Sequence, residues 1–294
     1  MNLPPSLKDA SERRSRMLAT ARAALAEDRI VPFYQPKVDL QAGRTVGWEA
    51  LLRIRGTDGE ILPPSAIEAA FSDADISLQL TDRMLSLVFA DIAAWRADKI
   101  DIGRVAVNIS AEDFRQSHAS GLVERLRSHA DFHTRPLTDI ELEVTEGVFI
   151  GQLASDVSGM LDELRALGVL IALDDFGTGY ASLTHLRQFP VDVIKIDRSF
   201  VERIDGKDPK STAVIDAILQ MAKRLGIQTV AEGIETKHQA QYLRMRGCST
   251  GQGYLFSRPV GAAEVTSLLA SLPNDRWEFG RAGAANDWAP AANG

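Results

Sequence analysis

The sequence lacks the features that mark secreted, membrane-spanning and nucleic-acid-binding proteins. Its 294 residues include one cysteine, Cys248, which excludes an intrachain disulfide framework and fits a reducing compartment. No apolar run approaches the length of a membrane span, and charged residues from Lys8 to Arg14 interrupt any N-terminal signal-peptide core. The formal net charge of -7 lacks the positive excess typical of a non-specific nucleic-acid binder. We therefore expect a cytoplasmic protein, or the cytoplasmic part of a larger one, with no membrane contact from this segment.

A repeating pattern of short apolar segments, polar loops and amphipathic helices fills most of the chain. It predicts strands at residues 30–38, 46–54, 105–108, 140–144, 169–173, 193–196, 228–232 and 253–256. Helices are expected near residues 77–98, 155–167, 212–225 and 237–246. Alternating strands and helices indicate a parallel sheet. This many strands in one domain favour a closed α/β barrel of the TIM type over an open sheet.

Two terminal segments flank the expected barrel. Residues 1–28 are predicted to form a charged helix or linker, either a packing helix or a connector from an upstream domain, and the sequence does not separate the two. Residues 29–272 hold the barrel. Residues 273–294 are rich in alanine, glycine, asparagine and aspartate, so we expect a mostly disordered tail. Pro32 and Pro36 in the first strand indicate an edge or otherwise unusual strand.

Two adjacent carboxylates, Asp174 and Asp175, follow the apolar segment 168–173 and precede Gly177. Neighbouring carboxylates repel, and they stay ionised together only if a cation or strong hydrogen-bond donors offset their charge. A pair of divalent metal ions would do so, because hard cations prefer oxygen ligands. The same residues are also ordinary turn chemistry before a glycine, so this pair alone leaves both interpretations open.

Other polar residues recur near the ends of the predicted strands. They are Glu49, Asn108, Glu143, Glu146, Lys195, Asp197, Glu232, Glu235 and Gln252. One such carboxylate would usually be a solvated rim charge, but its recurrence on five strands is a much rarer accident. In parallel barrels, functional residues gather at the carboxyl ends of the strands. The pattern therefore predicts a polar site at that end of the barrel.

The residue types at this site indicate hard metal ions. None of the five histidines lies at a predicted strand end, and an all-oxygen shell favours Mg²⁺ or Mn²⁺ over zinc. Several shared carboxylates suggest two metals about 3.5–4 Å apart, the arrangement used for phosphoester hydrolysis. Arg53, four residues after Glu49, could bind a phosphate oxygen. Lys195 could hold an attacking water, or it could only form a salt bridge to Asp197 or Glu232.

The segment Trp48-Glu49-Ala50-Leu51-Leu52-Arg53 resembles the signature of the EAL-domain cyclic di-GMP phosphodiesterases. The resemblance covers residues 29–272. Its further motifs are Tyr34-Gln35-Pro36, Asn108-Ile109-Ser110, Glu143-Val144-Thr145-Glu146, Asp174-Asp175-Phe176-Gly177-Thr178-Gly179-Tyr180, Lys195-Ile196-Asp197, Ala231-Glu232-Gly233-Ile234-Glu235 and Gln252-Gly253-Tyr254. In this order and together, these motifs are highly specific.

The resemblance implies a modified (β/α)8 barrel whose first strand runs antiparallel, which suits the two prolines. It also implies hydrolysis of cyclic di-GMP to linear pGpG, which lowers second-messenger levels, by a metal-activated water that attacks phosphorus. By family analogy, two Mg²⁺ or Mn²⁺ ions per site are held by Glu49, Asn108, Glu143, Asp174, Asp175 and Glu232. The implied catalytic residues are Glu49, Lys195 and Glu232. The implied substrate contacts are Gln35, Leu51, Arg53, Asp175 and Gln252, with Glu146, Asp197 and Glu235 in support.

The resemblance also implies a homodimer contact through the loop and helix that follow Asp175. The chain departs from the family pattern at Ala181, where serine is common, and in residues 64–68, which lack the usual phenylalanine before Ile67. Neither departure touches an expected metal ligand, and every ligand position is retained. This favours catalysis over a non-catalytic cyclic di-GMP receptor. A barrel metallophosphodiesterase for another substrate is a second alternative, and a nucleic-acid polymer is not an expected partner.

Overall fold

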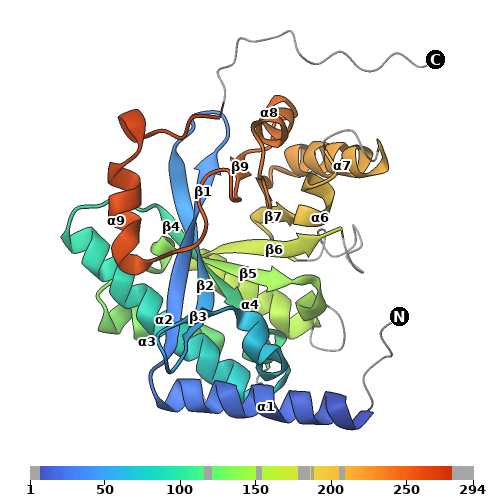
Figure 1. Cartoon of the computed structure of the whole chain (residues 1–294). Coiled ribbons are helices and arrows are strands. Elements are labelled where there is room, and N and C mark those ends of the chain that lie inside the picture. The colour runs from blue at the N-terminus through green and yellow to red at the C-terminus, as the bar shows by residue number, and fades with distance from the viewer. Residues whose placement is uncertain are drawn as a thin grey trace.

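A closed barrel of eight strands organises the chain (Figure 1). The strands are β1 (Ile30–Asp39), β2 (Thr45–Arg55), β4 (Arg104–Ile109), β5 (Ile140–Thr145), β6 (Leu170–Phe176), β7 (Val193–Ile196), β8 (Gln228–Ala231) and β9 (Thr250–Gly251). β1 pairs with β2 on one side and with β9 on the other, and this double pairing closes the barrel. The predicted fold class is therefore confirmed.

β1 runs antiparallel to β2 and β9, whereas the other neighbouring strands of the barrel pair in parallel. Towards β9 and the short strand β10 (Val260–Gly261), β1 pairs only at residues 33–34 and 38–39. Pro32 and Pro36 lie outside those paired positions. Their missing N–H groups therefore fall where this edge of β1 has no ladder partner among the residues that the structure describes, which is where a sheet tolerates proline.

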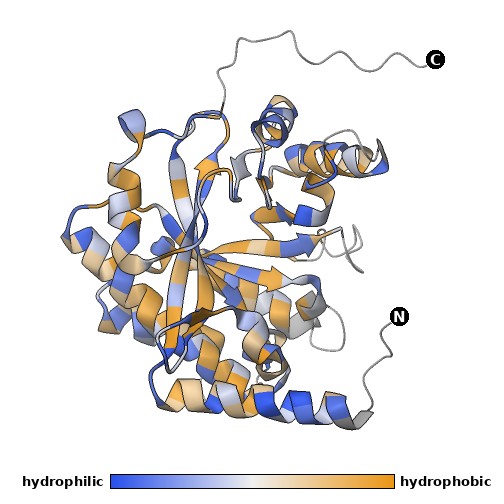
Figure 2. Ribbon diagram, in the orientation of Figure 1, coloured by the Kyte–Doolittle hydropathy of each residue, from blue (hydrophilic) through white to orange (hydrophobic). Residues whose placement is uncertain are grey.

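Helices surround the barrel, and apolar residues dominate its strands (Figure 2). The computed structural model describes residues 7–115, 121–149, 154–177, 186, 189–204 and 209–279. Its helices include α1 (Leu7–Ala26), α2 (Ala74–Ala97), α3 (Leu122–Phe132), α4 (Ala154–Ala166), α6 (Arg198–Val201), α7 (Pro209–Leu225), α8 (Lys237–Met245) and α9 (Ala262–Ala270). Smaller elements are β3 (Ile61–Leu62), η1 (Pro64–Ser72), η2 (Ala111–Phe114), η3 (Leu137–Asp139), η4 (Glu146–Phe149) and η5 (Pro273–Asp275). None of the helices in the described residues is long and apolar enough to cross a membrane.

The N-terminal helix α1 packs against η1 and α2. Ala21 and Ala24 are fully buried on its inner side, and Arg22 forms a 3.8 Å ion pair with Asp73. Asp73 is also the N-cap of α2, because its side chain accepts a hydrogen bond from the N–H of Ile76. α1 is thus joined to the outer layer of the barrel both by packing and through the start of α2.

The eighth barrel strand lies earlier than expected. We expected it at residues 253–256, but β9 covers Thr250–Gly251 and Gln252 directly follows it. The chain then turns around Ile234, whose N–H donates to the carbonyl of Gln252 at 3.0 Å and whose carbonyl accepts from Leu255 at 2.9 Å. A Cβ at Gly253 would lie 2.2 Å from the Ile234 carbonyl oxygen, so this close approach needs glycine.

The segment 273–279, at the start of the tail that we expected to be mostly disordered, packs on the barrel. The backbone N–H of Trp277 donates to the Gly43 carbonyl at 2.8 Å, and its indole N–H donates to Thr45 at 3.0 Å. Phe279 is 4% exposed and meets Phe256 edge-on, with ring centroids 5.4 Å apart. Residues 280–294 lie outside the described part of the chain.

We predict that Phe279→Ala lowers the free energy of unfolding by about 3 kcal/mol, the usual loss for truncating a buried phenylalanine. Urea denaturation of the full chain measures this change. The matched control is Phe132→Ala, because Phe132 is 82% exposed and its truncation should change stability by less than about 0.5 kcal/mol. Equal stability of the two variants would contradict the packing role of the C-terminal segment.

Candidate active site

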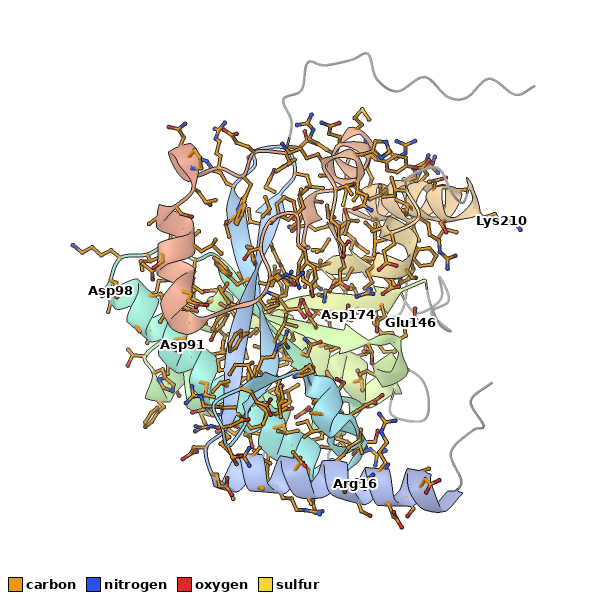
Figure 3. The ribbon with its side chains drawn as sticks, in the orientation of Figure 1. Arg16, Asp91, Asp98, Glu146, Asp174 and Lys210 are labelled. Atoms are coloured by element: carbon orange, nitrogen blue, oxygen red, sulfur yellow. The ribbon has the colours of Figure 1, made fainter. Side chains whose placement is uncertain are left out.

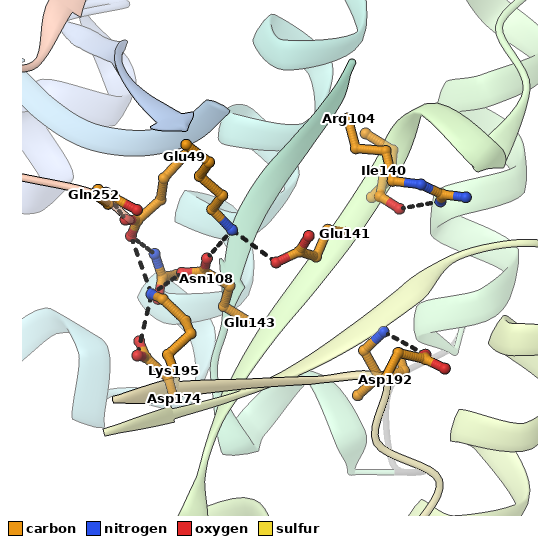
Figure 4. Close-up of polar contacts among 12 residues, drawn as sticks. Glu49, Arg104, Asn108, Ile140, Glu141, Glu143, Asp174, Asp192, Lys195 and Gln252 are labelled. Atoms are coloured by element: carbon orange, nitrogen blue, oxygen red, sulfur yellow. Dashed lines mark hydrogen bonds and ion pairs between the residues drawn. The ribbon is translucent and has the colours of Figure 1, made fainter. Parts of the chain in front are cut away.

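A buried ammonium group lies at the centre of the polar site (Figure 4). Lys195 is 1% exposed on β7. Its Nζ lies 2.6 Å from Glu143, 2.7 Å from Glu232, 3.1 Å from Asp174 and 3.7 Å from Glu49. These carboxylates come from β5, the end of β8, β6 and β2. The barrel thus gathers around Lys195 the residues that the sequence pattern placed near different strand ends.

Glu49 is held in place by amide side chains. Asn108 donates from Nδ2 to its Oε1 at 3.0 Å, and Gln252 donates from Nε2 to its Oε2 at 2.6 Å. Gln252 Nε2 also donates to Gln35 Oε1 at 2.9 Å, and Gln35 donates to the carbonyl of Ser257. This chain of contacts joins β1, β2 and the residue after β9. It fixes the orientation of Glu49 from both of its oxygens.

The buried carboxylates of the cluster outnumber its buried ammonium groups. Protonation of some carboxylates removes part of the resulting excess of negative charge. Burial and the charge of Glu143 raise the pKa of Glu49 to about 7. Burial, opposed by Lys195, raises the pKa of Glu232 to about 8. Burial also acts on Glu143, but Lys195 and Lys37 outweigh it and lower the pKa of Glu143 to about 2. Glu143 therefore stays ionised while two of its neighbours take up protons near neutral pH.

Asp175 adopts a left-handed backbone conformation, with φ of 55°. This conformation is uncommon outside glycine, although aspartate adopts it more readily than most residues. The N–H of Asp175 donates to Asp174 Oδ1 at 2.9 Å. Carboxylate oxygens of Asp174, Asp175 and Glu232 lie within 4.8 Å of one another, which is close enough to share a metal ion. This turn of the backbone thus occurs where the chain brings three carboxylates together.

Two cavities meet at this site. One, of about 230 Å³, is lined by acidic and polar residues that include Gln35, Asp174 and Lys195. The other, of about 520 Å³, is lined mainly by residues of β2, η1, α2 and β4. Glu49 and Leu51 line both cavities. Together the cavities offer an acidic compartment beside a more apolar one, the combination that a ligand with charged and planar parts requires.

The remaining expected residues lie around the cluster. The half-buried guanidinium of Arg53 donates to the Leu52 carbonyl at 2.9 Å, and burial lowers its pKa. Glu146, which Figure 3 labels together with Asp174, accepts a 3.4 Å hydrogen bond from the N–H of Gly177. Asp197 is the N-cap of α6, where it accepts from Ser199. Glu235 is exposed at the rim of the smaller cavity. The motif residues 178–180 and Ala181 lie outside the described residues.

Sequence reasoning missed two buried charged residues. Lys37 is 3% exposed and Glu141 is 7% exposed, and their side chains contact each other at 2.7 Å. Strand alternation contained a signal for both, because Lys37 lies two residues after Gln35 and Glu141 lies two before Glu143. Strand alternation therefore predicts that Lys37 faces the barrel interior like Gln35, and that Glu141 does so like Glu143.

A protein-family model described as "EAL domain" matches residues 18–259. The chain belongs to this family. The matched range covers all barrel strands and ends shortly after the turn that follows β9. EAL phosphodiesterases are metal-dependent, and the acidic cluster described above is present in this EAL domain.

Several named proteins are similar to this EAL domain. It is 39% identical over 266 residues to "Cyclic di-GMP phosphodiesterase PA2567" of Pseudomonas aeruginosa, covering 90% of this chain and 44% of that protein. It is 36% identical to "Probable cyclic di-GMP phosphodiesterase PdeG" of Escherichia coli, covering 86% and 49%. The chain thus spans less than half the length of these curated relatives. A solved structure, "PaMucR Phosphodiesterase, c-di-GMP complex", matches with a TM-score of 0.78 and 33% identity, covering 85% of this chain and 99% of that one.

The chemistry of the cluster fits divalent cations. Hard cations select carboxylate and amide oxygens, and the cluster offers both. Its carboxylates carry raised pKa values at Glu49 and Glu232, so protons supply positive charge that metal ions could replace. Within the described part of the chain, the buried Oε1 of Gln252 has no hydrogen-bond partner, and it is a further oxygen available to a cation or to its water. The residues present therefore suit a metal site.

We predict that the metal-free protein loses stability as the pH rises from about 5.5 to about 8. Glu49 and Glu232 bind protons more tightly when folded, since their pKa values of about 7 and about 8 exceed that of an unfolded glutamate. Their contribution is complete below the unfolded pKa and is lost as the pH passes the folded values. Melting temperatures in a chelator across this range test the slope. Glu232→Gln should flatten it, and an unchanged slope in that variant would contradict the assignment.

Proposed function

We propose that this chain hydrolyses cyclic di-GMP to linear pGpG in a metal-dependent reaction, and so lowers the level of this second messenger. The observation that carries the proposal is the set of carboxylate and amide oxygens around Lys195 at the carboxyl end of the barrel. The names of the similar proteins support the same substrate.

The metal ligands proposed for the site are Glu49, Asn108, Glu143, Asp174, Asp175 and Glu232. We propose Mg²⁺ or Mn²⁺, two per site, with Asp175 and Glu232 belonging to the second ion together with Asp174. Metal ions bound there would supply an activated water and neutralise charge on the phosphate. This proposal agrees with the close approach of Asp174, Asp175 and Glu232.

We propose that Lys195 orients the attacking water. Its Nζ is within 3.1 Å of three carboxylates that come from different strands, so its location is fixed from several sides. Although burial opposes it, these carboxylates raise the pKa of Lys195 well above its ordinary value. The side chain thus remains an ammonium group. Its three N–H groups point at carboxylates, and one of them can donate to a water or hydroxide when metal ions bind those carboxylates.

The substrate contacts proposed here are Gln35, Leu51, Arg53, Asp175 and Gln252. Arg53 is suited to a phosphate oxygen because a guanidinium keeps its charge in proteins and this one lies at the half-buried edge of the site. Leu51 lines both cavities and can contact a base or a ribose. Glu146 supports the chain after Asp175 through Gly177. Asp197 supports the turn after Lys195 by capping α6, and Glu235 is assigned a supporting place at the rim.

A homodimer contact through the loop and helix after Asp175 remains part of the proposal, as does a cytoplasmic location. Residues 178–185 of that segment lie outside the described residues. The location is supported by the single cysteine, Cys248, because one cysteine excludes an intrachain disulfide.

We predict that Glu49→Gln reduces turnover of cyclic di-GMP at least about a hundredfold, since loss of an outer-sphere support alone can reach that size. The substitution removes a charge while it keeps the side-chain volume. Chromatography of product after incubation with Mg²⁺ or Mn²⁺ measures pGpG. The control is Glu163→Gln on α4, an exposed partner of Arg127, which should retain activity. Product formation that survives thorough chelation would overturn the metal-dependent scheme.

The same assay separates the alternatives. Tight binding of cyclic di-GMP without product in the unaltered chain would favour a receptor. Faster cleavage of a different phosphodiester would favour another substrate.

We predict that Asp175→Asn lowers the number of Mn²⁺ ions bound at saturation from two towards one per chain, because the second proposed ion loses a carboxylate. Equilibrium dialysis with metal analysis measures this number. Asp216→Asn is the matched control, since Asp216 pairs with Arg246 away from the cluster. An unchanged number in Asp175→Asn would remove Asp175 from the ligand set.

A further inference from the structure

The barrel interior has a second layer of side chains below the active-site cluster. On three strands, the inward residue two positions before a cluster residue is apolar. These residues are Ala172 before Asp174, Val193 before Lys195 and Val230 before Glu232, and they form a small buried cluster of their own. On β1 and β5 the same layer is ionic, because it holds Lys37 and Glu141. The lower layer is therefore apolar on one side and charged on the other.

Lys37 reaches from β1 to both inward-facing glutamates of β5, Glu141 and Glu143. Its Nζ donates to Glu141 Oε1 at 2.7 Å and to Glu143 Oε1 at 2.8 Å. The other oxygen of Glu143, Oε2, accepts from Lys195 at 2.6 Å. Glu143 is thus held between two ammonium groups, and each of them takes a different oxygen.

An ion pair is an unfavourable way to fill a barrel interior. Desolvation of buried charges often offsets their attraction, and apolar residues of similar volume can stabilise a core equally well or better. The apolar half of the layer shows that this barrel can be filled by alanine and valine. The Lys37–Glu141 pair is therefore poorly explained by stability alone, and its contact with Glu143 offers a different reason for it.

We propose that Lys37 is a positioning residue for Glu143, and that Glu141 keeps its ammonium group in place. Lys37 occupies Oε1 of Glu143, so that only Oε2 faces the cluster and is available to a metal ion. This inference rests on the proposed metal role of Glu143. Orientation of a ligand by an outer hydrogen-bond partner is a common requirement of metal sites.

The test is a paired substitution that removes the ion pair without leaving a buried charge. Lys37→Met alone would leave the buried carboxylate of Glu141 without its ammonium partner, and this unpaired charge would destabilise the fold. Lys37→Met/Glu141→Leu replaces both members with apolar groups. We expect this double variant to melt at or above the temperature of the unaltered chain in a chelator. We also expect its Kd for Mn²⁺, measured by electron paramagnetic resonance, to be about tenfold or more higher.

The outcomes distinguish a role of Lys37 in orienting Glu143 from a role of the Lys37–Glu141 pair in filling the barrel interior. Unaltered Mn²⁺ affinity in the double variant would overturn the proposal and leave the proposed function intact. Failure of the double variant to fold would also overturn it, since the ion pair would then be needed for the barrel itself. Failure of the unaltered chain to bind Mn²⁺ would overturn the metal role of Glu143, and the positioning role with it. A control, Arg96→Met/Asp139→Leu, removes an ion pair outside the cluster and should leave Mn²⁺ affinity unchanged.

Discussion

Charge balance inside the barrel is the constraint on which the rest of this structure depends. Carboxylates from several strands converge on Lys195 and Lys37, and the two ammonium groups do not neutralise them all. In a weakly polar interior an uncompensated charge is expensive, so protons enter, as the raised pKa values of Glu49 and Glu232 indicate. The interior is thereby prepared for cations. This excess of negative charge would oppose a phosphate ligand on its own and would favour the uptake of metal ions.

The sequence was sufficient for the barrel and for most members of the cluster. Polar residues near the ends of otherwise apolar strands have few structural explanations, and the closed barrel brought Glu49, Glu143, Asp174 and Lys195 within reach of one another. The eighth strand was misplaced because residues 253–256 carry a short apolar run, while the turn that interrupts it depends on a contact with Ile234. A local sequence pattern cannot reveal this contact, because Ile234 and Gly253 are far apart in the sequence and meet only in the folded chain.

Distant pairing also explains the other differences. Lys37 and Glu141 are separated by 104 positions, so neither residue reveals the other until β1 and β5 face one another across the barrel. The composition of residues 273–294 suggested disorder, but Trp277 and Phe279 find partners near the turn between β1 and β2 and after β9. In each case tertiary contact decided what composition and spacing left open.

Because β1 runs antiparallel to its neighbours, the barrel closes between β1 and β9 through a short stretch of pairing, which we call the β1–β9 seam. β1 pairs with β2 over a long register but with β9 only at Val38 and Asp39. Closer to the active-site cluster, the side chain of Gln252, which follows β9, donates a hydrogen bond to Gln35 of β1. The same side chain also donates to Glu49. A fluctuation that parts β1 from β9 would therefore disturb Glu49 before it disturbs the parallel strands. A ligand that contacts both Gln35 and Gln252 would hold β1 and β9 together. Its binding would therefore slow hydrogen exchange of the backbone amides of these two strands.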